Sequence, residues 1–125
     1  MARILVIDDD QDMRAMVAQT LAPAGHEVIL AADGTEGVER HRASAADLVI
    51  TDLHMPKQNG IETIREFRRR WPEVALIAMS GSIAEVGTML SIAQNMNAIG
   101  VLQKPFVGDE LIAAVAKALA GQAPA

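Results

Sequence analysis

The stretch Ile4-Leu-Val-Ile-Asp-Asp-Asp10 places four apolar residues directly before three aspartates. A similar arrangement returns twice, because Asp52 follows the run Leu48–Thr51 and Lys104 follows the run Val101–Gln103. Short apolar runs of this kind are typical of strands buried on both faces of a parallel sheet. If the three runs are parallel neighbours, their charged residues meet at the carboxyl edge of the sheet, where open α/β sheets bind ligands. The sequence therefore predicts a site at that edge.

Apolar runs and amphipathic stretches alternate along the whole chain. The expected strands are residues 4–7, 28–31, 48–51, 75–79 and 101–102, and the expected helices are residues 12–21, 35–41, 61–70, 84–96 and 109–119. Pro23–Gly25 is a typical end for the first helix, and Pro72 for the third. Because parallel strands are joined by right-handed crossovers, the pattern predicts an α/β fold of five βα units, with helices on both faces of a parallel sheet.

Chain length bounds the domain organisation, since 125 residues suit one compact domain. Half of the residues are hydrophobic but only 2% are aromatic, so the core must consist mainly of Ile, Leu, Val, Ala and Met. We expect one domain over residues 1–120 and a short flexible tail over residues 121–125, with no output domain after it.

Charge and cysteine content exclude several classes of function. The formal net charge of −5 gives no electrostatic reason for direct binding to nucleic acid or to an anionic membrane. Without cysteine the chain has no disulfide framework, zinc–thiolate site or thiol nucleophile. The apolar run Ile4–Ile7 is too short for a signal peptide or a membrane-inserted segment. A cytoplasmic protein is therefore expected.

The adjacent carboxylates of Asp8, Asp9 and Asp10 repel one another, so something must offset their charge. Two carboxylates about 4 Å apart repel by roughly 4 kcal/mol at an effective dielectric constant near 20. Mg²⁺ prefers hard oxygen ligands and is usually bound by one or two carboxylates together with a phosphate, so we expect a divalent metal here. The alternative is a solvated loop that caps the first helix, since acidic residues are favoured at helix N-termini. Asp10 is expected to do only this, and Asp12 is a second capping candidate.

Asp52 lies in a second motif, Thr51-Asp-Leu-His-Met-Pro56, where the proline prevents the strand from simply continuing. A carboxylate can attack phosphorus and form an aspartyl phosphate when a metal and a cation neutralise the incoming group. Lys104 can supply that cation, and Ser80 can donate its hydroxyl to a phosphoryl oxygen. Each is an ordinary surface residue when taken singly, but the combination favours a phosphoryl site.

Four motifs in this order resemble the receiver domain of two-component response regulators. They are Ile4-Leu-Val-Ile-Asp-Asp-Asp10, Asp52-Leu-His-Met-Pro56 with Asn59-Gly60, Ala78-Met-Ser-Gly81 and Leu102-Gln-Lys-Pro-Phe106. The resemblance implies a flavodoxin-like fold with the strand order 2-1-3-4-5. It also implies a stand-alone, chemotaxis-regulator-like phosphorylation switch or phosphate shuttle that signals by protein contacts. Such a protein is not an enzyme, since its only chemistry is Mg²⁺-dependent self-phosphorylation and autodephosphorylation.

Asp52 is the phosphoacceptor that the resemblance implies. It would take the phosphoryl group from a phosphohistidine on a sensor histidine kinase or a histidine phosphotransfer protein. Asp9 and Asp52 would ligate Mg²⁺ (or Mn²⁺) together with the backbone carbonyl of His54, and Asp8 would act on the metal directly or through water.

Ser80 and Lys104 are implied to hold the phosphoryl oxygens, with Gly81 and Pro105 at the rim of the pocket. Family members often have a cis peptide bond at the position of Lys104-Pro105, which would aim the ammonium inward. The resemblance thus implies a complete phosphoryl pocket at the predicted edge.

Met13 and Phe106 are candidates for partner docking. Met13 belongs to a Met-rich stripe at helical spacing, and such a stripe is more often core than interface. The start of the first helix is nevertheless adjacent to Asp9, so Met13 with Pro105 and Phe106 could form an apolar rim for a helix of the kinase or phosphotransfer protein. The downstream protein is unknown, and phosphorylation-dependent dimerisation stays open.

Two other functions compete with the receiver interpretation. A hydrolase of the haloacid-dehalogenase type also uses an aspartyl phosphate, and Asp8 and Asp10 have the spacing of its Asp-x-Asp motif, but Asp52 is then unexplained and the chain has no room for a cap. A receiver-shaped interaction module that is never phosphorylated is supported only by Val101, which stands where the family has its switch aromatic in a chain without tyrosine. The complete set of acidic residues argues against this module.

Several conspicuous residues are expected to lie away from the site. His26 and His41 are expected on the surface. The basic run from Arg65 to Arg70 is expected on a solvated helix face. Trp71 is expected in the loop before the fourth strand, at the end of the sheet opposite to the site.

Overall fold

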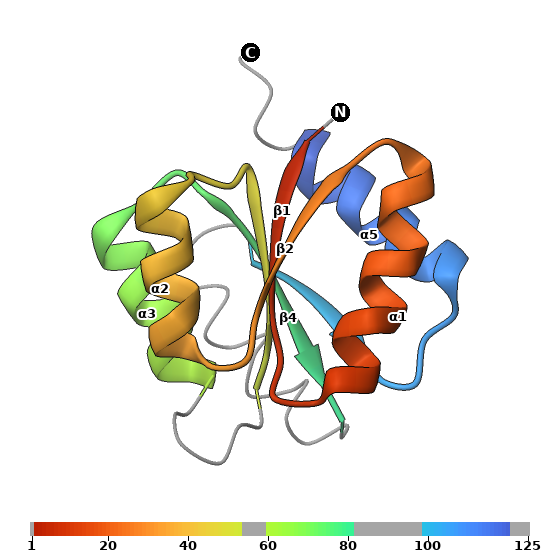
Figure 1. Cartoon of the computed structure of the whole chain (residues 1–125), viewed down its shortest axis with the longest axis horizontal. Helices are drawn as coiled ribbons and strands as arrows, with labels where there is room; N and C mark the ends of the chain where they lie inside the picture. Colours follow the sequence, from red (N-terminus) through yellow and green to blue (C-terminus); the bar gives the residue numbers. More distant parts are fainter. Residues whose placement is uncertain (1, 54–59, 82–98, 121–125) are drawn as a thin grey trace.

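The sheet of this protein has five strands, all parallel (Figure 1). The computed structural model describes residues 2–53, 60–81 and 99–120. The strands are β1 (Arg3–Ile7), β2 (Glu27–Ala31), β3 (Leu48–Asp52), β4 (Ala75–Ser80) and β5 (Ile99–Gln103), in the order β2-β1-β3-β4-β5. The predicted α/β class and strand order are confirmed.

Helices cover both faces of the sheet. Those in the described residues are α1 (Gln11–Leu21), α2 (Gly34–Ala43), α3 (Gly60–Arg70) and α5 (Gly108–Ala120), with a short 3-10 turn η1 (Ala22–Ala24) after α1. Figure 1 shows α1 and α5 on one face and α2 and α3 on the other, so the prediction of helices on both faces is confirmed. None of the described helices is long and apolar enough to cross a membrane. The helix expected at residues 84–96 and the tail expected at residues 121–125 lie outside the described residues.

Strand β1 shows why the apolar runs are uninterrupted. Ile4 and Val6 belong to the core that includes residues of α1 and α5, whereas Leu5 and Ile7 belong to the core that includes residues of α2 and α3. All four side chains are fully buried. Because successive side chains of a strand point to opposite faces, a strand covered on both sides needs an apolar residue at every position.

Asp10 and Gly25 set the two ends of the first helical segment. The Asp10 side chain accepts hydrogen bonds from the backbone N–H groups of Asp12 at 2.9 Å and Met13 at 3.3 Å. Asp10 is therefore the N-cap, as predicted, and Asp12 is not. After η1, Gly25 adopts a left-handed φ of 96°, which glycine reaches without steric penalty.

His41 is not on the surface, contrary to expectation. It is 4% exposed, and its Nδ1 accepts a hydrogen bond from the backbone N–H of Ala46 at 3.0 Å. Its ring centroid lies 4.3 Å from that of Trp71 and 5.4 Å from that of Phe67, and burial lowers the pKa of the imidazole. His26 is also partly buried. The helical spacing of the inward face of α2 explains the position of His41, since the buried residues of this helix are Gly34, Gly37, Val38 and His41.

Arg68 departs from the predicted solvated helix face. It is partly buried, and its guanidinium donates hydrogen bonds to the carbonyls of Pro72 at 3.0 Å and Val74 at 2.6 Å. These bonds tie the end of α3 to the segment that enters β4. The prediction holds for the exposed members of the run, which are Arg65, Arg69 and Arg70.

Candidate functional site

Asp8, Asp9 and Asp52 come together at the carboxyl edge of the sheet. Asp8 directly follows β1 and Asp52 ends the neighbouring β3, where Ile7 pairs in register with Thr51. One carboxylate oxygen from each aspartate lies within 4.8 Å of the others. Asp8 is fully buried and Asp52 is 5% exposed, whereas Asp9 is exposed. Three carboxylates in this arrangement offer the hard oxygen ligands that a divalent cation such as Mg²⁺ prefers.

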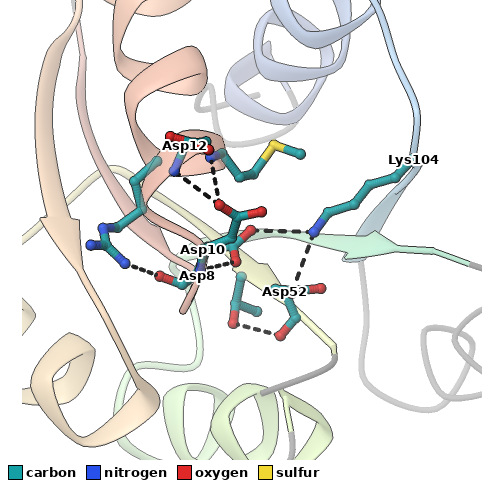
Figure 2. A network of polar contacts seen from close by, with 8 residues as sticks. Asp8, Asp10, Asp12, Asp52 and Lys104 are labelled. Atoms are coloured by element: carbon teal, nitrogen blue, oxygen red, sulfur yellow. Dashed lines mark hydrogen bonds and ion pairs between the residues drawn. The ribbon is translucent and has the colours of Figure 1, made fainter. Parts of the chain in front are cut away.

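Lys104 reaches the same carboxylates from the end of β5. Its Nζ lies 3.3 Å from Oδ2 of Asp8 and 3.3 Å from Oδ2 of Asp52, so the ammonium bridges the two buried carboxylates (Figure 2). The backbone N–H of Lys104 donates to the carbonyl of Ser80 at 2.6 Å, which joins the ends of β4 and β5. The Lys104–Pro105 peptide bond is cis, as expected.

Asp8 is held at each of its polar groups. Its backbone N–H donates to the carbonyl of Ala31, at the end of β2, at 3.1 Å. Its Oδ1 accepts a hydrogen bond from the backbone N–H of Asp10 at 2.9 Å, and its backbone carbonyl accepts one from the Arg14 guanidinium at 2.6 Å. With Lys104 on Oδ2, these contacts fix both the main chain and the side chain of Asp8.

Arg14 is a site residue that the motifs do not single out. It lies near the N-terminus of α1, where the helix dipole disfavours positive charge. The carbonyl of Asp8 accepts a hydrogen bond from its guanidinium and gives this charge a fixed partner. This conflict between charge and helix dipole is the sequence signal that could have revealed it.

Burial and charge shift two pKa values in the site. Burial raises the pKa of Asp8 to about 6; the Asp10 N–H and Lys104 oppose this shift, and the negative charge of Asp52 adds to it. Burial acts to lower the pKa of Lys104, but attraction to Asp8 and Asp52 outweighs it, and the net shift is upward. The ammonium offsets only part of the charge of three carboxylates. The donor set and its remaining negative charge therefore fit Mg²⁺ (or Mn²⁺).

The other predicted pocket residues lie at the ends of the adjoining strands. Ser80 is the last residue of β4, next to β3 in the sheet, and is fully buried. Gly81 and Pro105 are exposed and follow Ser80 and Lys104 in the chain. The carbonyl of His54 lies outside the described residues.

Met13 and Phe106 are both partly buried and pack against the core that includes residues of α1 and α5. Each has a core contact and a remaining exposed part, so their role in docking stays a prediction. Val101 is partly buried as well and packs against the opposite core, which contains Phe67.

Residues 4–116 match the family described as the response regulator receiver domain. The chain belongs to this family. Receiver domains are signalling domains of two-component systems; they bind Mg²⁺ at an acidic pocket and interact with histidine kinases, phosphotransfer proteins and downstream targets. Asp8, Asp9 and Asp52 of this chain form a cluster of carboxylates that can hold a metal ion.

Relatives of very different lengths share this domain. The chemotaxis protein CheY of Bacillus subtilis is 31% identical, and the match covers 94% of this chain and 97% of CheY. The DNA-binding transcriptional regulator NtrC of Azospirillum brasilense is 34% identical over 98% of this chain, but this is only 25% of NtrC. Among solved structures, NtrX from Brucella abortus has a TM-score of 0.89 at 31% identity and covers 97% of this chain and 27% of NtrX. The chemotaxis protein CheY4 of Vibrio cholerae has a TM-score of 0.86 at 28% identity, covering 94% of this chain and 98% of CheY4.

Proposed function

We propose that this receiver is a phosphoacceptor whose Asp52 takes a phosphoryl group from the phosphohistidine of a sensor histidine kinase or a histidine phosphotransfer protein. Mg²⁺ (or Mn²⁺) would bind beside it, and the phosphorylated form would signal through contact with a further protein in the cytoplasm. The observation that carries the proposal is the cluster of Asp8, Asp9 and Asp52 at one edge of the sheet, in which the Lys104 ammonium contacts the carboxylates of Asp8 and Asp52.

In the proposed reaction a carboxylate oxygen of Asp52 forms a bond to phosphorus while the bond from phosphorus to the donor histidine breaks. The imidazole leaves with the electron pair of that bond and takes up a proton, and Asp52 becomes an acyl phosphate. The new group brings a charge of about −1.5 to −2 next to Asp8 and Asp9. Positive groups must therefore be in place before transfer.

Lys104 and Ser80 are the groups of this chain that can receive the phosphoryl oxygens. The Lys104 ammonium already contacts Oδ2 of Asp52, so it can pass from the carboxylate to a phosphoryl oxygen with a small movement. Ser80 ends the strand beside β3 and can donate its hydroxyl to a second oxygen. A divalent cation held by Asp8, Asp9 and Asp52 would supply the remaining positive charge.

Asp10 distinguishes this function from an aspartyl-phosphate hydrolase of the haloacid-dehalogenase type. In such an enzyme Asp8 and Asp10 would both serve the reaction. Here Asp10 caps α1 with its side chain, and the carboxylate group consists of Asp8, Asp9 and Asp52. This geometry supports Asp52 as the acceptor.

Intact mass after incubation with acetyl phosphate, with and without Mg²⁺, tests the proposal in wild type, Asp52→Asn and Asp109→Asn. The last variant changes an exposed acid in the first turn of α5 and serves as the matched control. We expect a gain of one phosphoryl group in wild type and Asp109→Asn, only with Mg²⁺, and none in Asp52→Asn.

Other outcomes point elsewhere. Labelling of Asp52→Asn would move the acceptor to another residue. Steady release of phosphate without accumulation on the protein would favour the hydrolase. No labelling of wild type, with acetyl phosphate or with a kinase, would favour the interaction module.

A further inference from the structure

Asp9 is the exposed member of the proposed metal ligands. No surrounding packing fixes an exposed side chain, so its direction depends on the main chain that carries it. That main chain is the short loop between β1 and α1, formed by residues 8–10. Ligands keep their geometry only when the groups behind them are held, and such outer contacts are part of a metal site.

Arg14 holds this loop at two points. Its backbone N–H donates to the carbonyl of Asp10 at 3.0 Å, and its guanidinium donates to the carbonyl of Asp8 at 2.6 Å. Figure 2 draws the second contact as the dashed line from a guanidinium to Asp8. The two carbonyls belong to the residues directly before and after Asp9. One residue therefore fixes the backbone on both sides of the exposed ligand.

The kind of acceptor separates Arg14 from Lys104. Lys104 occupies carboxylate oxygens of Asp8 and Asp52, whereas Arg14 binds a main-chain carbonyl. Arg14 thus takes no oxygen that a metal needs. Its positive charge alone opposes the approach of a divalent cation. Any benefit of Arg14 to metal binding must therefore come from geometry.

We infer that Arg14 is a positioning residue for the metal site, which fixes the Asp9 carboxylate through the carbonyl of Asp8. The inference rests on the proposed function, in that Asp8, Asp9 and Asp52 are taken as metal ligands. Loss of such a supporting contact typically lowers metal affinity about 10–100-fold.

The test is a titration of the full chain with Mn²⁺, in which unbound Mn²⁺ is measured by electron paramagnetic resonance. Arg14→Met keeps the length of the side chain but has no donor, whereas Arg14→Lys keeps a donor and the charge. Arg69→Met removes the same charge from an exposed position on α3 and is the matched control. We expect affinity to fall about 10-fold or more in Arg14→Met and to stay near the wild-type value in the other two.

Equal or tighter Mn²⁺ binding by Arg14→Met overturns the inference, because that is the result of removing a positive charge alone. Labelling with acetyl phosphate gives a second readout. At saturating Mn²⁺ the rate of Arg14→Met should return to that of wild type, since Arg14 contacts none of the reacting atoms, and a deficit that persists at saturation overturns the positioning role.

Thermal unfolding in EDTA shows whether each variant is folded before titration. If Arg14→Met does not fold, Arg14→Ala, which also has no side-chain donor, carries the same expectation of weaker binding. A wild-type protein that binds no Mn²⁺ overturns the proposed metal site together with this inference. Equal binding by wild type and Arg14→Met overturns the inference alone.

Discussion

At the carboxyl edge of the sheet, the buried carboxylates of Asp8 and Asp52 share the ammonium of Lys104. At the amino edge, before β3 and β4 begin, the buried imidazole of His41 accepts one hydrogen bond and packs against Trp71. Burial raises the pKa of Asp8 to about 6 and lowers that of His41. Both shifts favour the neutral form, since burial disfavours charge.

Only one of the two shifts lowers stability at neutral pH. Asp8 is mostly ionised at pH 7, so its raised pKa reports an unfavourable buried charge in the metal-free protein. His41 is neutral at the same pH, in the form that its surroundings favour. The comparison teaches that the carboxyl edge holds a buried negative charge that a divalent cation can offset, whereas the buried imidazole at the amino edge carries no charge at this pH.

His41→Ala should give the largest change in stability. The substitution leaves a cavity beside Phe67 and Trp71 and removes the acceptor of the Ala46 N–H, so we expect the free energy of unfolding to fall by about 2–4 kcal/mol. Urea unfolding followed by circular dichroism measures it. His26→Ala, at a less buried position, should cost less. Equal losses in the two variants would contradict the prediction that the buried contacts of His41 contribute more to the free energy of unfolding than those of His26.

The pH dependence of this loss tests the charge state of His41. Its pKa in the folded state lies below the value of about 6.5 expected when unfolded, so the unfolded state binds the proton first as pH falls. The contribution of His41 to the free energy of unfolding is therefore fully present above pH 6.5 and decreases as the pH falls below it. The gap between wild type and His41→Ala should narrow from pH 7.5 to pH 5.5, and a constant gap would show that His41 titrates equally in both states.

Asp8→Asn should give a smaller change, of opposite sign. The folded-state pKa of Asp8, about 6, exceeds its ordinary value of 3.8. Protonated Asp8 therefore contributes to stability below pH 3.8, and this contribution is lost as the pH rises through about 6. Asparagine carries no charge and can still accept the Asp10 N–H. In EDTA at pH 7 we therefore expect a gain of about 1–2 kcal/mol in the free energy of unfolding by urea. The gain is less than the full shift because the buried amide NH2 of asparagine would lie beside the Lys104 ammonium, which cannot accept a hydrogen bond.

Two further measurements sharpen this expectation. The gain of Asp8→Asn should shrink as pH falls from 6 towards 4. Mg²⁺ should stabilise wild type but not Asp8→Asn, because a ligand stabilises only the state that binds it. The exposed Asp109→Asn variant should stay within about 0.5 kcal/mol of wild type at every pH. A loss of stability in metal-free Asp8→Asn would contradict the view that the carboxyl edge is electrostatically unfavourable.

The same contrast explains what the sequence could predict. The strand positions follow from β1 and its neighbours, where burial on both faces forces an apolar residue at every position. The gathering of Asp8, Asp52 and Lys104 follows from their place after parallel strands. Pattern alone was sufficient for these features, because periodicity and strand ends are visible in the chain.

The sequence patterns did not single out Arg14, and they wrongly placed His41 and Arg68 at the surface. The three residues share a physical reason. Arg14 and Arg68 donate to backbone carbonyls, and His41 accepts from a backbone N–H. Almost every residue carries such backbone groups, so the sequence does not indicate which of them a side chain will contact. The sequence identifies charged side chains that can pair with each other. It does not show which backbone group a side chain contacts, and only the folded structure reveals that.

Trp71 should show the smallest effect, and it tests whether the two edges are independent. It is the only tryptophan, it lies between α3 and β4, and it packs against His41 and Phe67. The length of β3, roughly 15 Å at about 3.3 Å per residue, separates this group from the carboxylates. Mg²⁺ should therefore leave Trp71 emission almost unchanged, whereas acidification that protonates His41 should alter it. Strong saturable quenching by Mg²⁺ would show that binding at the carboxyl edge moves the amino edge, and the two could then no longer be treated as separate.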